Sequence, residues 1–519
     1  MGRYSVEVRD AYGRLVTVLL RAQKKQFSVY RNRPGSCQFT LDLYDPQATT
    51  LNLKLNQYDI VFRREGTPVF AGQISYLDPK IDGDTKTVDV IATGYFDLFD
   101  QRFVTSDYPG YDALHDQLPF ASTDASQVAW TLVNDAQFPL SSDGSQTSTG
   151  TNLTLAQSFV APGTANLTTL KLLLTNTSAT GNLVVSLYTD FNGAPSNVQV
   201  PNSQKTIAVA GISSTLSWYE IDYTGTLPAL TQGATYWIEA YLDTTQSGSN
   251  GIYWSYLNND YYINGRAYCL QNPSLFTTGQ DLQFFALLDD NSFQMTKNTY
   301  LGITQGNLPT SYNITPVYSR FKKIKDAVEG IANTYNGIDF SVSFAIDSVN
   351  DRLTKTFNTY YPRQGVDNTN LNFSYPGNIK KLEKPKDGKT MVNEVAMRGQ
   401  GSGVNQLTVI ENDSASIQAY GQRQDVEQES DVSNQSTLQL LGQELIRVRK
   451  DPLDLPNIVL DGNQAPHIGD FGVGDQITFN ISEVPIMQDL SQVVYRIEQI
   501  DVTISDNDLE EVNLTVSLA

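Results

Sequence analysis

The most constraining feature of this sequence is an alternation of apolar and polar residues that continues from residue 4 to about residue 104. Its segments include YSVEVRD, CQFTLDLYD and KTVDVIATGY, with Gly, Pro and Asp between them. Alternation at a period of two places every second side chain on one face of a strand, so this region predicts an antiparallel sheet curled into a small barrel or sandwich. Residues 59–64 and 69–72 predict a hairpin whose turn is Glu65-Gly66-Thr67-Pro68.

Three later segments change to helical spacing. One helix is expected from Thr123 or Asp124, either of which can cap it, to about residue 137. Others are expected over residues 318–332 and 436–450, where apolar side chains recur three and four residues apart. The last of these stops before a proline. The end of the chain returns to the β pattern.

The composition shifts between residues 150 and 298. A polar, linker-like stretch at 139–150 precedes this region, which contains three of the four Trp, many Ser, Thr and Asn, and few basic residues. Eight or nine short strands separated by Gly- or Asn-rich turns suit a two-sheet jelly roll.

Composition excludes several classes of function. A chain of 519 residues is expected to form about three or four domains of roughly 150 residues. Its net charge of -20 disfavours specific nucleic-acid binding, which depends on Lys and Arg at phosphates. Two cysteines and two histidines in no recognisable motif predict no catalytic group, no cofactor and no metal. Neither an export signal nor a membrane anchor is expected.

The regions before and after the predicted jelly roll resemble the tail hub family of long-tailed, non-contractile phages, also called minor tail or baseplate hub proteins. The resemblance lies in the order of elements and in the phrases TDASQVAWTLVNDAQ, LGITQG, YSRFKKIKDAVEGIANTYNGIDFSV and DFGVGDQITF. It covers roughly residues 1–137 and 301–519. The family is related in fold to the hubs of contractile tails and injection systems.

The resemblance implies a mainly β fold with α+β parts and two tail-hub β-barrels. The first barrel would be 1–105, the connecting α+β domain 106–140 with 299–379, the inserted jelly roll 141–298, and the second barrel 380–519 with helix 436–450. It also implies a homotrimer in the virion tail tip, made in the host cytoplasm. Expected partners are the distal tail protein, the tape measure protein and tail fibre or tip proteins, and DNA would pass through the lumen without specific binding.

The inserted segment resembles carbohydrate-binding jelly rolls, which implies a host surface polysaccharide as ligand. Aromatic rings can stack on the apolar face of a sugar while amide, carboxylate and guanidinium groups bond its hydroxyls. Strand alternation equally predicts aromatic residues in the core, where Trp218 and Trp237 are expected. Asp190-Phe-Asn192-Gly193 fits a plain β-turn better than a calcium loop. The candidate glycan-binding residues are Trp254, Tyr256, Asn258, Asn259, Asp260, Tyr261, Tyr262 and Arg266.

Two other functions fit some of these features. A secreted bacterial glycan-binding or glycoside-degrading protein would explain the jelly roll but would need an export signal and paired catalytic carboxylates. A hub of a contractile injection system would share the fold. A non-enzymatic tail hub fits more of the chain than either alternative.

Overall fold

The computed structural model describes the chain except for residues 1–3, 51, 141–144, 149–152, 274, 277–278, 335, 386–387, 431 and 452–455, so half of the predicted linker at 139–150 lies outside the described residues. The fold is mainly β with α+β parts, as predicted. Two compact units are present. Unit 1 comprises Met1–Val104, Asp112–Val133 and Gly302–Ala519, and unit 2 comprises Thr105–Tyr111 and Asn134–Leu301.

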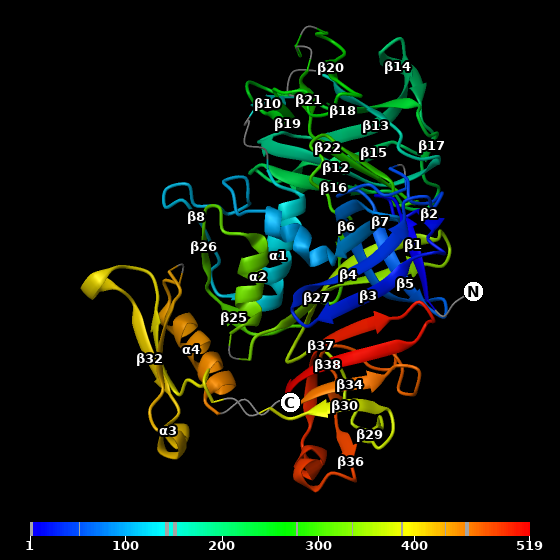
Figure 1. Cartoon of the computed structure of the whole chain (residues 1–519). Helices are drawn as coiled ribbons and strands as arrows, with labels where there is room; N and C mark the ends of the chain where they lie inside the picture. Colours follow the sequence, from blue (N-terminus) through cyan, green and yellow to red (C-terminus); the bar gives the residue numbers. More distant parts are fainter. Residues whose placement is uncertain are drawn as a thin grey trace. The chain divides into compact units, whose positions relative to one another are not determined.

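Unit 1 is built on a 12-stranded sheet that joins the two ends of the chain (Figure 1). Seven strands come from the N-terminal region and five from the C-terminal region, and antiparallel pairing of β3 with β37 connects them. Buried apolar side chains from both groups form one continuous hydrophobic cluster. Along the sheet the strands are β2 (Leu15–Val18), β1 (Tyr4–Arg9), β5 (Asp59–Arg64), β6 (Thr67–Asp82), β7 (Thr85–Thr93), β4 (Arg33–Asp42), β3 (Gln23–Tyr30), β37 (Tyr495–Ile504), β38 (Glu510–Leu518), β34 (Asn457–Asp461) and β30 (Ile379–Glu383), with β35 (Gln476–Ile477) also on β37.

The predicted hairpin is confirmed, with a shorter turn. β5 and β6 pair from Asp59–Gln73 to Arg64–Thr67, so the loop is Glu65-Gly66 alone. Both loop residues have positive φ, at 49° and 88°. A two-residue loop of this kind matches the twist of the flanking strands, and glycine adopts the second position at little cost.

Short elements connect the two groups of strands within unit 1. Helix α1 (Ala125–Gln137) begins where predicted, because the Asp124 carboxylate accepts from the Ser126 N–H at 2.9 Å. Helix α2 is Ile324–Ala332 and not 318–332, because Tyr318 belongs to a strand and Phe321 has a φ of 65°. The remaining strands and the 3-10 helices are η1 (Tyr95–Gln101), β8 (Gln117–Pro119), β9 (Thr123–Asp124), β24 (Ile303–Gln305), β25 (Asn313–Ile314), β26 (Val317–Ser319), β27 (Asp339–Asp347), β28 (Arg352–Tyr360), β29 (Phe373–Tyr375), β36 (Phe479–Ile481) and η4 (Pro485–Gln492).

Between β30 and β34 the chain forms a small α/β lobe with its own core. Helix α4 (Gln435–Arg449) lies within one residue of the predicted 436–450, and Asn434 caps it by accepting from the Ser436 and Thr437 N–H groups. Val395 and Met397 of the lobe's own β-sheet pack with Leu438 and Ile446 of α4. The other elements are β31 (Glu394–Arg398), η3 (Gly403–Asn405), β32 (Thr408–Asn412), α3 (Ser414–Tyr420) and β33 (Gln424–Gln428).

Unit 2 contains two antiparallel sheets that share one hydrophobic core, which is a β-sandwich arrangement. The eight-stranded sheet contains β10 (Ser145–Ser148), β19 (Gly251–Leu257), β12 (Ala165–Thr177), β22 (Phe284–Leu288), β23 (Phe293–Met295), β16 (Ser217–Asp222), β17 (Ala229–Leu230) and β21 (Asp281–Leu282). The six-stranded sheet contains β14 (Ala194–Gln199), β13 (Asn182–Phe191), β18 (Thr235–Leu242), β11 (Leu155–Val160), β20 (Ala267–Cys269) and β15 (Lys205–Ala208), and η2 (Val209–Gly211) follows β15.

Two properties of the described residues bear on function. None of their helices combines the length and the apolar character needed to cross a membrane. No group of three or more His, Cys, Asp or Glu side chains among them is placed to hold a metal ion.

Candidate functional site

Trp254, the central residue of the predicted glycan site, lies in the core of the sandwich. Its side chain is fully buried in β19, and its indole N–H donates to the Gln283 carbonyl at 2.8 Å. The alternation of β19 directs Ile252 and Trp254 into the same core. No face of this ring is open to a sugar, so the assignment of Trp254 is corrected to a core residue.

Tyr262 is also a core residue. It is 6% exposed, its ring meets that of Phe284 edge-on at 5.6 Å, and its hydroxyl accepts from the Val160 N–H at 3.0 Å. Tyr256 is half-buried against Phe276, with ring centroids 5.6 Å apart. The physical reason is the same in each case, because an aromatic ring gains more by covering the sandwich core than by facing water.

The remaining five predicted residues lie on the surface of unit 2. Asn258, Asn259, Asp260 and Tyr261 follow β19 in one exposed loop, and Arg266 precedes β20. Tyr261 is 43% exposed, with the Lys297 ammonium 5.4 Å from its ring centroid. These exposed groups supply hydroxyl-bonding partners and one accessible ring.

A buried carboxylate holds this loop in place. Asp281 is 1% exposed and accepts from the Gln157 amide at 3.0 Å and from the Tyr262 N–H at 3.1 Å. Burial raises the pKa of Asp281 to about 6, although these hydrogen bonds oppose the shift. The conformation of the exposed loop therefore depends on a polar group inside the sandwich.

The turn Asp190-Phe-Asn192-Gly193 is a β-turn, as predicted. Phe191 pairs with Ala194, so Asn192-Gly193 is a two-residue hairpin loop with φ values of 54° and 74°. The Asp190 carboxylate accepts from the Gly193 N–H at 3.1 Å and from the Trp237 indole at 2.8 Å. Its oxygens therefore have protein partners.

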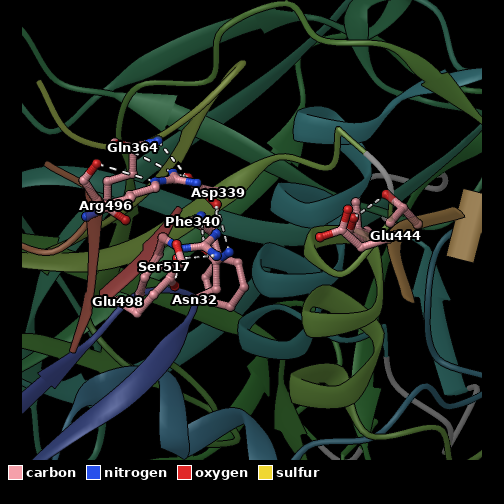
Figure 2. Close-up of polar contacts among 12 residues, drawn as sticks. Asn32, Asp339, Phe340, Gln364, Glu444, Arg496, Glu498 and Ser517 are labelled. Carbon is pink, nitrogen blue, oxygen red and sulfur yellow. Dashed lines mark hydrogen bonds and ion pairs between the residues drawn. The ribbon is translucent and has the colours of Figure 1, made fainter. Parts of the chain in front are cut away.

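A second candidate site lies in unit 1, where the two groups of strands meet. Asp339 of β27 is 2% exposed and stands between two guanidinium groups. One of its oxygens accepts from Arg31 at 2.5 Å and from Asn32 at 2.8 Å, and the other accepts from the Gln364 N–H at 2.7 Å and from Arg496 (Figure 2).

This ion network links β27 to β37 and to the segment that follows β3. Arg31 follows β3 and also pairs with Glu498 of β37 at 2.7 Å, while Arg496 belongs to β37 itself. Although burial alone would raise it, the pKa of Asp339 is lowered by the two guanidinium groups. The network thus fixes the β3–β37 connection and positions β27 against it.

A second buried pair joins the same two groups of strands. Arg64 at the end of β5 and Glu510 at the start of β38 are 2.9 Å apart, and their side chains are 8% and 0% exposed. Between β3 and β37, the Ser28 hydroxyl donates to Asp501 at 2.6 Å. Sequence patterns did not reveal these contacts, because their partners are more than 400 residues apart in the chain.

No protein-family model and no curated protein sequence matches this chain. Three solved structures to which it is similar are tail proteins. A tail protein from Neisseria meningitidis is 9% identical, with 99% of this chain and 96% of that chain covered and a TM-score of 0.41. The 43 kDa tail protein of prophage MuSo2 from Shewanella oneidensis is 8% identical, with coverage of 99% and 98% and a TM-score of 0.46. Prophage tail protein gp18 from Listeria monocytogenes is 10% identical, with coverage of 98% and 94% and a TM-score of 0.38.

Proposed function

We propose that this chain is a structural hub of a long-tailed phage, located at the tail tip or baseplate of the virion. The observation that carries the proposal is the continuous sheet of unit 1, in which strands from the two ends of the chain meet at β3 and β37. The sequence resemblance implies two related β-barrels per chain. Each of the two groups of strands would form one of these barrels. The buried network around Asp339 connects the two groups within unit 1.

Such a block suits a ring. A homotrimer of chains that each contribute two strand groups would present six similar positions, which matches a hexameric tail tube. Contacts between copies would be heterologous, and they close a ring only when the rotation between copies is correct. Expected neighbours are the distal tail protein, the tape measure protein and fibre or tip proteins.

The charge of the chain fits passage of DNA through such a ring. With a net charge of -20, the protein repels phosphate, so DNA would move past it without specific binding. Unit 2 would bind host surface saccharide, and the exposed residues Asn258, Asn259, Asp260, Tyr261 and Arg266 are candidates for that contact.

Mass photometry of the purified chain and cryo-electron microscopy of tail tips test the hub proposal. The expected particle has three times the 57.5-kDa chain mass, with three copies per virion. Six copies in the virion, or a chain that remains monomeric there, would overturn the assignment of two strand groups to six ring positions.

The same preparation can test whether the β3–β37 connection supports assembly. Val29 of β3 lies opposite Ile500 of β37, and Val29→Pro would remove a backbone donor from β3. The matched control is Val198→Pro in unit 2, where the side chain is 62% exposed. Loss of the trimer in the first variant and its retention in the second is expected.

A further inference from the structure

The outer face of the six-stranded sheet in unit 2 carries an unusual set of side chains. Along β18, Tyr236, Ile238 and Ala240 belong to the sandwich core, so Trp237, Glu239 and Tyr241 point to the opposite face. Neighbouring strands add two tyrosines to this face, because Tyr188 of β13 lies opposite Trp237 and Tyr268 of β20 lies opposite Ala156. Figure 1 shows β13 and β18 side by side.

Glu239 stands at the centre of this face between two small residues. Its direct cross-strand neighbours are Ser186 on β13 and Ala156 on β11, both buried. Glu239 is only 6% exposed, and among the residues that the structure describes no hydrogen bond or ion pair reaches its carboxylate. Burial raises the pKa of Glu239 to about 7.

Neither oxygen of Glu239 is fully enclosed, but the carboxylate has little contact with water and no protein partner among the described residues, which is costly for its charged form. An apolar residue at position 239 would serve the fold better, since the adjacent outward residues Val184 and Ala156 are apolar and buried. A ligand that donates hydrogen bonds to Glu239 would offset the cost when bound. The side chains around Glu239 indicate what kind of ligand this is.

The surrounding groups favour a neutral, polar ligand with an apolar face. Tyr188, Tyr241 and Tyr268 are half-buried and offer rings and hydroxyls. A positively charged ligand would meet Arg266, whose guanidinium lies 5.9 Å from the Trp237 ring centroid and 5.7 Å from that of Tyr268. Neutral saccharides combine hydroxyl donors with an apolar ring face and carry no positive charge.

We propose that this outer face binds a neutral saccharide, with Glu239 accepting hydrogen bonds from sugar hydroxyls and Tyr188, Tyr241 and Tyr268 contacting the sugar ring. The proposal rests on the saccharide-binding role of unit 2 and moves its centre from the loop at 258–266 to the sheet. Arg266 stands at the border of the two surfaces, where it donates to the Gly193 carbonyl.

Isothermal titration calorimetry on the full-length chain tests this site. The probes are tetrasaccharides of glucose, galactose and N-acetylglucosamine, with the tetrasaccharide of glucosamine as the cationic comparison. We expect at least one neutral probe to bind, and Glu239→Gln to weaken that binding at least 10-fold. Tyr241→Ala serves as a second variant on the same face. Thermal unfolding of each variant checks that it is folded.

Glu220→Gln is the matched control, because Glu220 is the other glutamate between residues 134 and 301. It lies on the eight-stranded sheet, opposite Lys171 of β12, and its carboxylate pairs with that lysine at 2.7 Å. Binding by Glu220→Gln should equal that of the parent protein.

Each contrary outcome identifies which proposal fails. If none of the probes binds the parent protein, the saccharide role of unit 2 fails and the sheet site fails with it. If a neutral probe binds and Tyr261→Ala abolishes binding while Glu239→Gln and Tyr241→Ala do not, unit 2 binds saccharide through its loop and the sheet site is overturned. Binding of the glucosamine probe alone would overturn the choice of a neutral ligand.

Discussion

Replacing Asp339 by Asn should destabilise unit 1 by leaving two guanidinium groups without their shared counterion. The Asp339 side chain is 3% exposed, that of Arg496 is 8% exposed, and that of Arg31 is 22% exposed. Each carboxylate oxygen accepts from two donors, so an amide NH2 group would face donors in either orientation. Removing one partner of a buried ion pair costs about 3–5 kcal/mol. Because Arg31 keeps its pair with Glu498, we expect about 3 kcal/mol.

Hydrogen–deuterium exchange measured by mass spectrometry can assign this loss to unit 1. A loss of about 3 kcal/mol corresponds to exchange that is roughly 100-fold faster at the most protected amides of β27 and β37. Peptides from unit 2 should exchange as in the parent protein. The control variant Asp367→Asn changes an exposed aspartate that accepts from Thr369, and it should exchange at the parental rate.

A second substitution tests the mechanism of that loss. Adding Arg496→Met to Asp339→Asn removes the guanidinium that Asp339→Asn leaves without a carboxylate partner, so it should recover part of the stability. Acceleration below about 5-fold in Asp339→Asn, or no recovery in the double variant, would show that the guanidinium groups do not depend on Asp339.

Three further predictions concern unit 2. Trp254→Ala should lower the stability of unit 2 by about 3–5 kcal/mol, measured by urea unfolding, because it empties a core position; a change below about 1 kcal/mol would place Trp254 outside the core. The raised pKa of Glu239, about 7 in the folded state, means that folding binds a proton between the unfolded value and pH 7. Unit 2 should therefore lose stability as the pH rises from 5 to 7.5. Thermal scans should show that Glu239→Gln reduces this dependence of stability on pH. An unchanged dependence in the variant would contradict the prediction. Replacing residues 138–298 by a short Gly-Ser linker should leave unit 1 folded by circular dichroism, because the Thr299 hydroxyl donates to the Gln137 carbonyl at 2.7 Å and the ends of the excised segment are close; loss of the unit 1 fold would show that unit 2 is integral to it.

The sequence distinguished exposed from buried residues only in part among the candidate site residues, for a physical reason. Asn258, Asn259 and Asp260 are exposed because polar residues after an apolar strand favour a surface loop. The prediction that Trp254 and Tyr262 are exposed was wrong. Aromatic residues occur both in cores and on binding surfaces, so the residue type alone does not distinguish the two. Glu239 was missed, since one carboxylate within an apolar strand carries no motif.

The sequence by itself determined the class of the fold and the local elements. Period-two alternation indicated strands, and Glu65-Gly66-Thr67-Pro68 indicated a hairpin turn. A cap at Thr123 or Asp124 and the apolar spacing over residues 436–450 indicated helices. Each of these signals depends on residues close together in the chain. Only the tertiary structure decided which strands are neighbours and which strand face is covered. The pairing of β3 with β37 joins residues more than 400 positions apart. The alternation along β18 puts Ile238 and Glu239 on opposite faces of the strand. Because the other sheet of the sandwich packs against the face that carries Ile238, Glu239 lies on the outside.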